Sequence, residues 1–399
     1  MQPLLALAIA LRDRGHTASF VAPSNFVEWI RARGFEAQSN GIDVEAVLQE
    51  AGADLQSLRW QMRHLNDLTA QLFDAVSRAT ADCDVIVAAG IQMAAVSVAQ
   101  WRGVPCASAA FCPCVVPGSG APPPFVHIQT LPAWINRLIW LIGAPVAGLT
   151  LRGAINRGRA TLSLPPIWDA LRHLGGDCML VAADPDLAPL GEDAPAIAVP
   201  TDAWILEETT SLDPRVAAFL DLDPPPIYVG FGSMVAKRVP ALAAHAVAAA
   251  RALGRRAIIA GGWAGLDRHI PAADDILTIG AAPHAAIFPR VAALVHHGGA
   301  GTTTAAASAG VPQVILPHIL DQFYWAHRVE RLGLGPRALP VDLITADILA
   351  DRLDAALNDA GIRRRAAVLG SAVAAGNGAP AAIDHLERLV EESRQAIRY

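Results

Sequence analysis

Apolar runs and helix-forming segments alternate along the first half of the chain. Residues 3–14 have proline in the first turn, good helix formers behind it and a glycine after them, an order that predicts a helix. A short strand at 17–22 and a second helix at 26–33 follow. Residues 84–89 are apolar throughout, as in a strand buried on both faces of a parallel sheet, and 104–110 give another strand. The alternation predicts a doubly wound α/β domain.

The second half repeats this pattern. Strand, helix and strand are predicted first at 227–231, 240–253 and 256–260, and again at 293–296, 303–309 and 314–316. Two consecutive α/β domains place a ligand in the cleft where they meet. We therefore expect a binding cleft between the two halves.

A stretch rich in proline and acidic residues, 184–226, divides the two halves, and we place the domain boundary within it. This gives an N-terminal domain at 1–200 and a C-terminal domain at 201–399. The amphipathic segment 380–397 predicts a final helix that packs back on the N-terminal domain. Residues 113–135, rich in proline and glycine, predict a long ordered loop or lid.

The most apolar window of the chain lies at 138–149. Its twelve residues are fewer than the roughly 20 that a membrane-spanning helix needs. We interpret the window as a core helix. The alternative is a surface helix whose Trp134 and Trp140 contact a membrane interface.

Composition excludes some partners and suggests a compartment. The net charge of −6 gives the chain no overall attraction to nucleic acid. The five cysteines form no pair of C-x-x-C motifs, so we expect neither zinc nor a disulfide framework. Residues 1–10 lack the basic start of a secretory signal. We expect a cytoplasmic protein, with peripheral attachment at the inner membrane face left open.

The strongest chemical signal is HHGGAGTTT, residues 296–304. It follows a predicted strand and opens a helix, so its glycines allow backbone amides to converge on an anion at the positive end of the helix dipole. The imidazole of His297 is able to donate a further hydrogen bond to a phosphate. The spacing is neither that of a dinucleotide-binding G-x-G-x-x-G nor that of a Walker loop. The segment therefore predicts a phosphate site of another kind.

This segment is part of a longer run, 296–322, that resembles the donor signature of family 1 nucleotide-sugar glycosyltransferases with the GT-B fold. The resemblance is to the branch of sterol glucosyltransferases and of bacterial antibiotic and lipid glycosyltransferases. Further matching segments lie at 24–35, 224–234, 261–266 and 282–299. The resemblance covers most of the chain and implies two Rossmann-like domains that face a central cleft.

The resemblance also implies a donor site. The turn at 232–233, the His297 imidazole and the amides of 299–302 would hold the diphosphate, the pair 321–322 the sugar hydroxyls, and the backbone at Ala282 the base. The implied donor-binding residues are Gly232, Ser233, Ala282, His297, Gly299, Ala300, Gly301, Thr302, Asp321 and Gln322. Because these groups neutralise the leaving diphosphate, the implied enzyme needs no metal.

The chain departs from the family at its start. Relatives have a strand and a loop of the type G-[ST]-R-G-D-V-Q-P before the first helix, whereas here Met1-Gln2-Pro3 stands where they have V-Q-P. That loop carries or surrounds the group that deprotonates the acceptor, so we assign no catalytic residue. A start placed too late is the explanation we favour, and a shortened protein is the alternative. Loss of a central strand predicts unpaired sheet edges.

The activity implied by the resemblance is inverting transfer of a hexose, glucose from UDP-glucose, to a hydroxyl of a lipophilic acceptor. Sterol-like, terpenoid, polyketide and lipid acceptors all fit. A UDP- or dTDP-sugar would serve as co-substrate, and no cofactor is implied. One alternative is a donor-binding but catalytically silent protein that lacks the base-bearing loop. Another is a UDP-sugar epimerase with the same fold.

Overall fold

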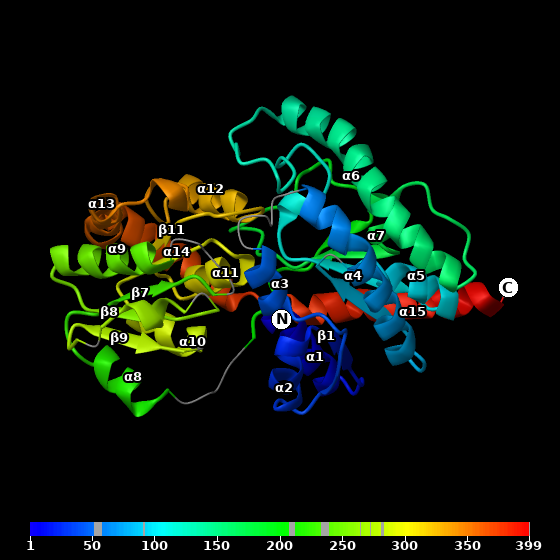
Figure 1. Cartoon of the computed structure of the whole chain (residues 1–399), viewed down its shortest axis with the longest axis horizontal. Helices are drawn as coiled ribbons and strands as arrows, with labels where there is room; N and C mark the ends of the chain where they lie inside the picture. Colours follow the sequence, from blue (N-terminus) through cyan, green and yellow to red (C-terminus); the bar gives the residue numbers. More distant parts are fainter. Residues whose placement is uncertain are drawn as a thin grey trace.

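The computed structural model describes residues 1–51, 58–90, 92–206, 212–232, 239–263, 265–271, 273–280 and 283–398. Two α/β domains lie beside one another (Figure 1), which confirms the doubly wound architecture. The C-terminal domain has a parallel five-stranded sheet of order β11-β10-β7-β8-β9. Its strands are β7 (Ile227–Gly230), β8 (Ala257–Ala260), β9 (Ile276–Ile279), β10 (Ala293–His296) and β11 (Gln313–Ile315).

The strands of the N-terminal domain form two separate parallel sheets. One sheet pairs β1 (Ser19–Ala22) with β2 (Glu36–Ser39), and the other has the order β3 (Ile86–Ala89), β4 (Cys106–Ala110), β5 (Cys178–Val181) and β6 (Ala198–Pro200). Within the described residues, β1 and β3 each pair with one strand only. Unpaired edges had been predicted here.

Helix α1 (Gln2–Asp13) connects the two N-terminal sheets. Leu5 and Ala8 pack with the β1–β2 sheet, while Ala6 and Leu7 pack with β4 and β5. Because both sides of the helix are covered by apolar residues, α1 acts as a core element between two open sheets. Burial lowers the pKa of the Met1 α-amino group at its start.

The helices cover both faces of the sheets. In the N-terminal domain they are α2 (Ser24–Arg31), α3 (Val44–Ala51), α4 (Leu58–Ala79), α5 (Ala95–Arg102), α6 (Ala133–Thr161) and α7 (Ala170–Leu174). The others are α8 (Pro214–Leu220), α9 (Val239–Ala252), α10 (His284–Ile287), α11 (Ala300–Ser308), α12 (Gln322–Leu332), α13 (Ala346–Asn358), α14 (Ala360–Ala375) and α15 (Ala379–Arg398). Both β6 and α8 lie inside the stretch 184–226, which is therefore more structured than its composition suggested.

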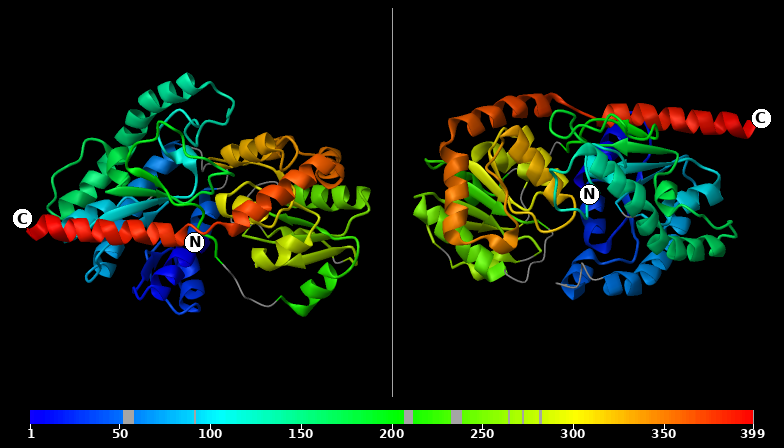
Figure 2. Two further views of the ribbon diagram at one scale, coloured as in Figure 1. Left: turned by 180° about the vertical axis from the view of Figure 1, so that it is seen from behind. Right: turned by 90° about the horizontal axis from the view of Figure 1, so that it is seen from above.

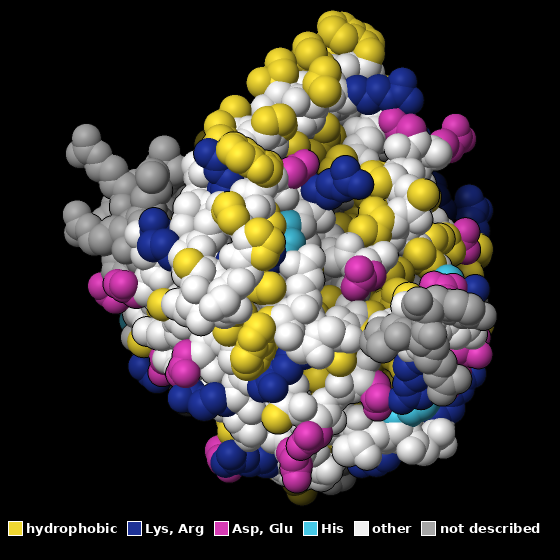
Figure 3. Space-filling view, turned by 90° about the vertical axis from the view of Figure 1, so that its right-hand side faces the viewer, with side chains coloured by type: hydrophobic (Ala, Val, Ile, Leu, Met, Phe, Trp, Pro, Cys, Tyr) yellow, Lys and Arg dark blue, Asp and Glu magenta, His cyan; other side chains and the backbone are white. Residues whose placement is uncertain are grey.

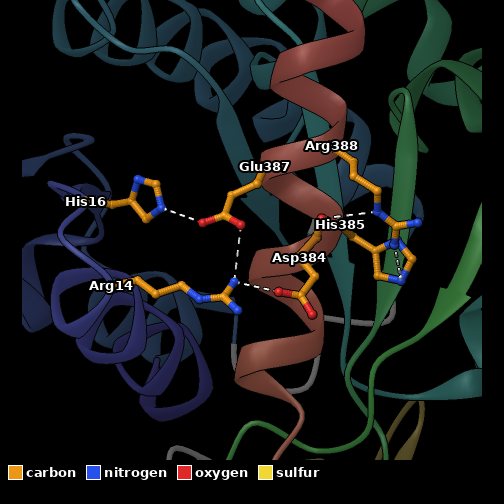
Figure 4. Close-up of polar contacts among 6 residues, drawn as sticks. All are labelled: Arg14, His16, Asp384, His385, Glu387 and Arg388. Carbon is orange, nitrogen blue, oxygen red and sulfur yellow. Dashed lines mark hydrogen bonds and ion pairs between the residues drawn. The ribbon is translucent and has the colours of Figure 1, made fainter.

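The final helix, α15, runs from the C-terminal domain along the N-terminal domain (Figure 2). Ile383 and Leu386 are buried against α1 and the strands behind it. A polar rim surrounds this contact (Figure 4): Arg14 lies 2.6 Å from Asp384, and His16 Nε2 lies 2.9 Å from Glu387. Exposed ion pairs of this kind contribute little to stability, so the buried apolar residues hold α15 in place.

The apolar window 138–149 is not a core helix, so our interpretation of it was wrong. It belongs to the 29-residue α6, which projects from the N-terminal domain (Figure 1), and Leu141 is 73% exposed. Trp140 lies on the opposite side, where it is buried and donates a hydrogen bond to the Ala121 carbonyl at 3.0 Å. The helix is apolar on both sides and packs by only one of them, a distinction that composition does not reveal.

Candidate donor-binding site

The predicted phosphate site is a strand, a tight turn and a helix. Strand β10 ends at His296, and α11 begins at Ala300, three residues earlier than predicted. Gly298 has a φ of +88°, a conformation that favours glycine, and a Cβ there would lie 2.7 Å from a side-chain carbon of Ile315. No side chain caps α11 and its first turn has no acidic residue. The positive end of the helix is thus open to an anion.

The imidazole of His297 lies over this helix start. A Cβ on Gly299 would lie 2.5 Å from its Nε2, so glycine at 299 provides the space that the ring occupies. Burial, and then the nearby His318 and His284, lower the pKa of His297 to about 4. The ring is therefore neutral at pH 7. Its buried Nδ1 has no hydrogen-bond partner among the described residues, a costly state that a ligand would relieve.

A buried network holds the turn in place. The Gly298 amide donates to His296 Nδ1 at 3.1 Å, so the other ring nitrogen carries the proton and donates to Gln313 Oε1 at 3.0 Å. Burial lowers the pKa of His296 to about 3, which keeps the ring in this neutral form. Gln313 was not among the predicted site residues. It lies 17 residues along the chain, on the neighbouring strand, and no local spacing connects it with His296.

Gly232, another predicted donor contact, lies close to the ring of His297. It follows β7, and a Cβ on it would lie 3.5 Å from the His297 ring. Its carbonyl accepts a hydrogen bond from the Trp263 amide at 3.0 Å, which fixes the turn. Ser233 and Ala282 lie outside the described residues.

The predicted sugar contacts stand beside the phosphate turn. Asp321 precedes α12, and burial raises its pKa. Gln322 is only 5% exposed, and its Oε1 accepts hydrogen bonds from the amides of His318 at 2.8 Å and Ile319 at 3.1 Å. A Cβ on Gly298 would lie 3.1 Å from the Gln322 carbonyl oxygen. The two motifs thus meet at the carboxyl ends of the neighbouring strands β10 and β11, where open α/β sheets bind ligands.

His318 is a candidate that the sequence analysis missed. Its Nδ1 lies 2.8 Å from the Leu316 carbonyl, which only accepts, so this nitrogen carries the proton. The opposite nitrogen, Nε2, is therefore an acceptor, and it is buried without a partner among the described residues. The ring stands edge-on to Phe231 at 5.7 Å. Its place three residues before Asp321 is the only signal in the sequence that points to it.

His284 stacks on Phe288 with ring centroids 4.3 Å apart. Its Nδ1 is also buried without a described partner, and burial lowers its pKa to about 4. Within the described residues, no group of three or more His, Cys, Asp or Glu side chains is placed to hold a metal ion. Because burial lowers their pKa values, His284 and His297 are neutral at pH 7, and each has a ring nitrogen available for a hydrogen bond.

The loop at 113–132 reaches across from the N-terminal domain to the sugar end of the site. The ring of His127 stacks on Phe323 of α12, with centroids 4.0 Å apart and planes 11° apart. On the diphosphate side, Phe26 of α2 contacts Trp263 at 5.9 Å. Aromatic contacts thus join the two domains on both sides of the candidate site.

Comparison with known proteins identifies the fold. Residues 258–389 match the family described as erythromycin biosynthesis protein CIII-like, C-terminal domain. The calicheamicin glycosyltransferase CalG4 shares the fold with a TM-score of 0.71, covering 98% of this chain and 94% of that chain at 18% identity. The fold is therefore that of the GT-B class.

Relatives with similar sequences show which family of the GT-B class the chain belongs to. The vancomycin aglycone glucosyltransferase of Amycolatopsis orientalis is 38% identical over 376 residues, which cover 93% of this chain and 90% of the relative. The dTDP-epi-vancosaminyltransferase of the same organism is 33% identical over 363 residues, covering 89% and 86%. The chain belongs to the family 1 GT-B glycosyltransferases.

Proposed function

We propose that this enzyme transfers a hexose, with inversion, from a nucleoside-diphosphate sugar to a hydroxyl of a lipophilic antibiotic aglycone. The observation that carries the proposal is a buried ring nitrogen of His297, without a partner among the described residues, at the uncapped start of α11. A Cβ on Gly232 would lie 3.5 Å from this ring, and a Cβ on Gly298 would lie 3.1 Å from the Gln322 carbonyl oxygen. The names of the two relatives favour an antibiotic aglycone among the acceptors that the sequence left open.

The chemistry follows from where charge develops. The acceptor oxygen attacks the anomeric carbon from the face opposite the diphosphate, and the bond from that carbon to the phosphate oxygen breaks. The leaving diphosphate gains negative charge, which the amides of the first turn of α11 and the N–H of His297 stabilise. These groups stabilise the negative charge that a divalent cation stabilises in other enzymes, so we propose a metal-independent reaction. The acceptor proton passes to a base that we do not assign.

The sugar is held from α12 and the loop before it. Asp321 accepts hydrogen bonds from sugar hydroxyls, and Nε2 of His318 offers a further acceptor for a hydroxyl. Our choice of donor rests on the names of the two relatives. One is a glucosyltransferase, and the name of the other specifies dTDP. We propose glucose as the sugar, with UDP-glucose as the first donor to test and dTDP-glucose as its comparator.

The experiment is a transfer assay with the full chain. Each donor is incubated with vancomycin aglycone and with hydrophobic alcohols, and glycosides are detected by mass spectrometry. His297→Ala should lower turnover by about 100-fold, as losses of comparable groups do. The matched control is His385→Ala, because His385 lies on α15 and bonds to Arg388 of the same helix (Figure 4). Binding of UDP without any transfer would overturn the proposal and support a silent protein.

A further inference from the structure

Helix α6 presents a long apolar face to solvent. Its large exposed side chains recur at intervals of three and four residues and therefore lie on one side of the helix. They are Trp134, Leu138, Leu141, Ile142, Val146 and Leu149, and we name them the α6 apolar face. At 1.5 Å per residue the face is about 22 Å long. Figure 3 shows hydrophobic side chains gathered along the projecting top of the molecule, where α6 lies.

The preceding loop extends this face. Phe125 is 57% exposed, and its ring comes within 3.4 Å of where a Cβ on Gly143 would stand. Ile128 of the same loop is 61% exposed. Monomeric proteins seldom leave contiguous apolar surface of this kind in water unless a partner covers it.

The charge on α6 indicates which partner. Within Ala133–Thr161 there are four arginines and no acidic residue, although the whole chain has a net charge of −6. Arg159 is buried and Arg137 pairs with Asp193, so the positive charge that α6 presents at its surface comes from Arg152 and Arg157. Arg152 continues the line of the apolar face at its C-terminal end and lies over the Trp168 ring at 5.5 Å. An apolar face that begins with Trp134 and ends at Arg152 suits the boundary between acyl chains and anionic headgroups.

Buried polar side chains of α6 show that this helix is not placed to cross a bilayer. By length and composition alone, α6 and the stretch Ala360–Ala396 are the described helices able to span a bilayer. However, Asn136 and Arg159 of α6 are each only 4% exposed. Asn136 donates to the Ser119 carbonyl at 3.0 Å, and Arg159 donates to Gln100 Oε1 at 2.7 Å. Lipid on all sides would break these bonds.

We propose that the α6 apolar face docks the enzyme on an anionic phospholipid bilayer, with α6 lying in the plane of the interface. The loop that extends the face also carries His127, which stacks on Phe323 next to Asp321. Docking would therefore bring the acceptor side of the active site close to the lipid. A lipophilic acceptor would then have a short path from the bilayer to the donor sugar.

The test is flotation of the full chain with vesicles, without donor or acceptor, so that it does not depend on the proposed function. Vesicles of phosphatidylcholine alone are compared with vesicles that also contain phosphatidylglycerol. The variant carries Leu141→Asp and Ile142→Asp. The matched control is Val368→Asp, because Val368 is an equally exposed apolar residue, 69%, on helix α14. Thermal melts and UDP binding check that each variant is folded.

The wild type and the control should float with the anionic vesicles, less so at high salt, and the double variant should bind at least about tenfold more weakly. Absence of wild-type binding, or equal binding by the double variant, would overturn the proposal. So would equal flotation with neutral vesicles, since the arginines would then have no role. A wild-type dimer that the double variant dissociates, without lipid binding, would assign the face to a second copy instead.

Discussion

The imidazole of His297 fills the space that a side chain on Gly299 would need, since a Cβ there would lie 2.5 Å from Nε2. The φ of Gly299 is −68°, an ordinary value for any residue. Glycine is therefore required at this position by the neighbouring ring and not by its backbone conformation. The two residues form one unit: the small residue fixes where the ring stands over the helix start.

We predict that Gly299→Ala displaces the ring and lowers kcat/KM by roughly 100-fold, about as much as loss of the imidazole itself. The melting temperature should change little, because no backbone strain is introduced. Gly153→Ala serves as the control, since it adds the same methyl group to an exposed position in α6 of the other domain. Steady-state kinetics and melts on both variants decide the matter. Unchanged kinetics for Gly299→Ala would remove His297 from the donor site.

We predict that replacing Asp321 and replacing Gln322 have different effects on the enzyme. Asp321→Asn should weaken binding of the complete donor while UDP alone binds as before, because the carboxylate faces the sugar in our proposal. Titrations of UDP and of UDP-glucose measure this difference. An equal loss of affinity for both ligands would place Asp321 at the nucleotide.

Gln322→Ala should destabilise the protein as well. It leaves the amides of His318 and Ile319 without their acceptor, at a cost of about 1–3 kcal/mol for each one that stays buried and unpaired. The melting temperature should fall, and sugar discrimination should fall with it. A variant with normal stability would mean that the loop does not depend on this side chain.

We predict that activity survives removal of divalent cations, because the helix amides and His297 supply the charge stabilisation. Transfer is measured after treatment with EDTA and again after magnesium or manganese is added. Retention of most of the rate is the expected result. A rate lost with the chelator and restored by either metal contradicts the prediction.

The phosphate turn was predictable because its determinants are adjacent in the sequence. The run at 296–304 predicts both the tight turn and the helix N-terminus that follows it. The supporting network was not predictable from the sequence. Gln313 and His318 come close to the turn because β10 pairs with β11. The exposed face of α6 was not predictable either. An apolar sequence predicts a helix, and only tertiary packing decides which side of it is covered.

The donor domain should lose stability in mild acid. Burial lowers the pKa of His284 and His297 to about 4 and that of His296 to about 3, while an unfolded histidine titrates near 6.5. Between these values the unfolded chain binds protons that the folded chain excludes. Stability is therefore fully present above about pH 6.5 and declines as the pH falls toward about 4. Three such groups would change the free energy of unfolding by up to about 4 kcal/mol per pH unit, a large share of a typical 5–15 kcal/mol.

Thermal melts between neutral pH and pH 5 test this expectation, and His284→Phe refines it. The phenylalanine should stack on Phe288 as the imidazole does, it removes one titrating group, and it leaves no ring nitrogen unpaired. The variant should thus keep its fold at pH 7 and lose stability less steeply in acid, because one of the buried histidines no longer titrates. A flat profile for the wild type would show that the folded protein accepts these protons. Equal slopes for both proteins would show that His284 is not among the groups that exclude them.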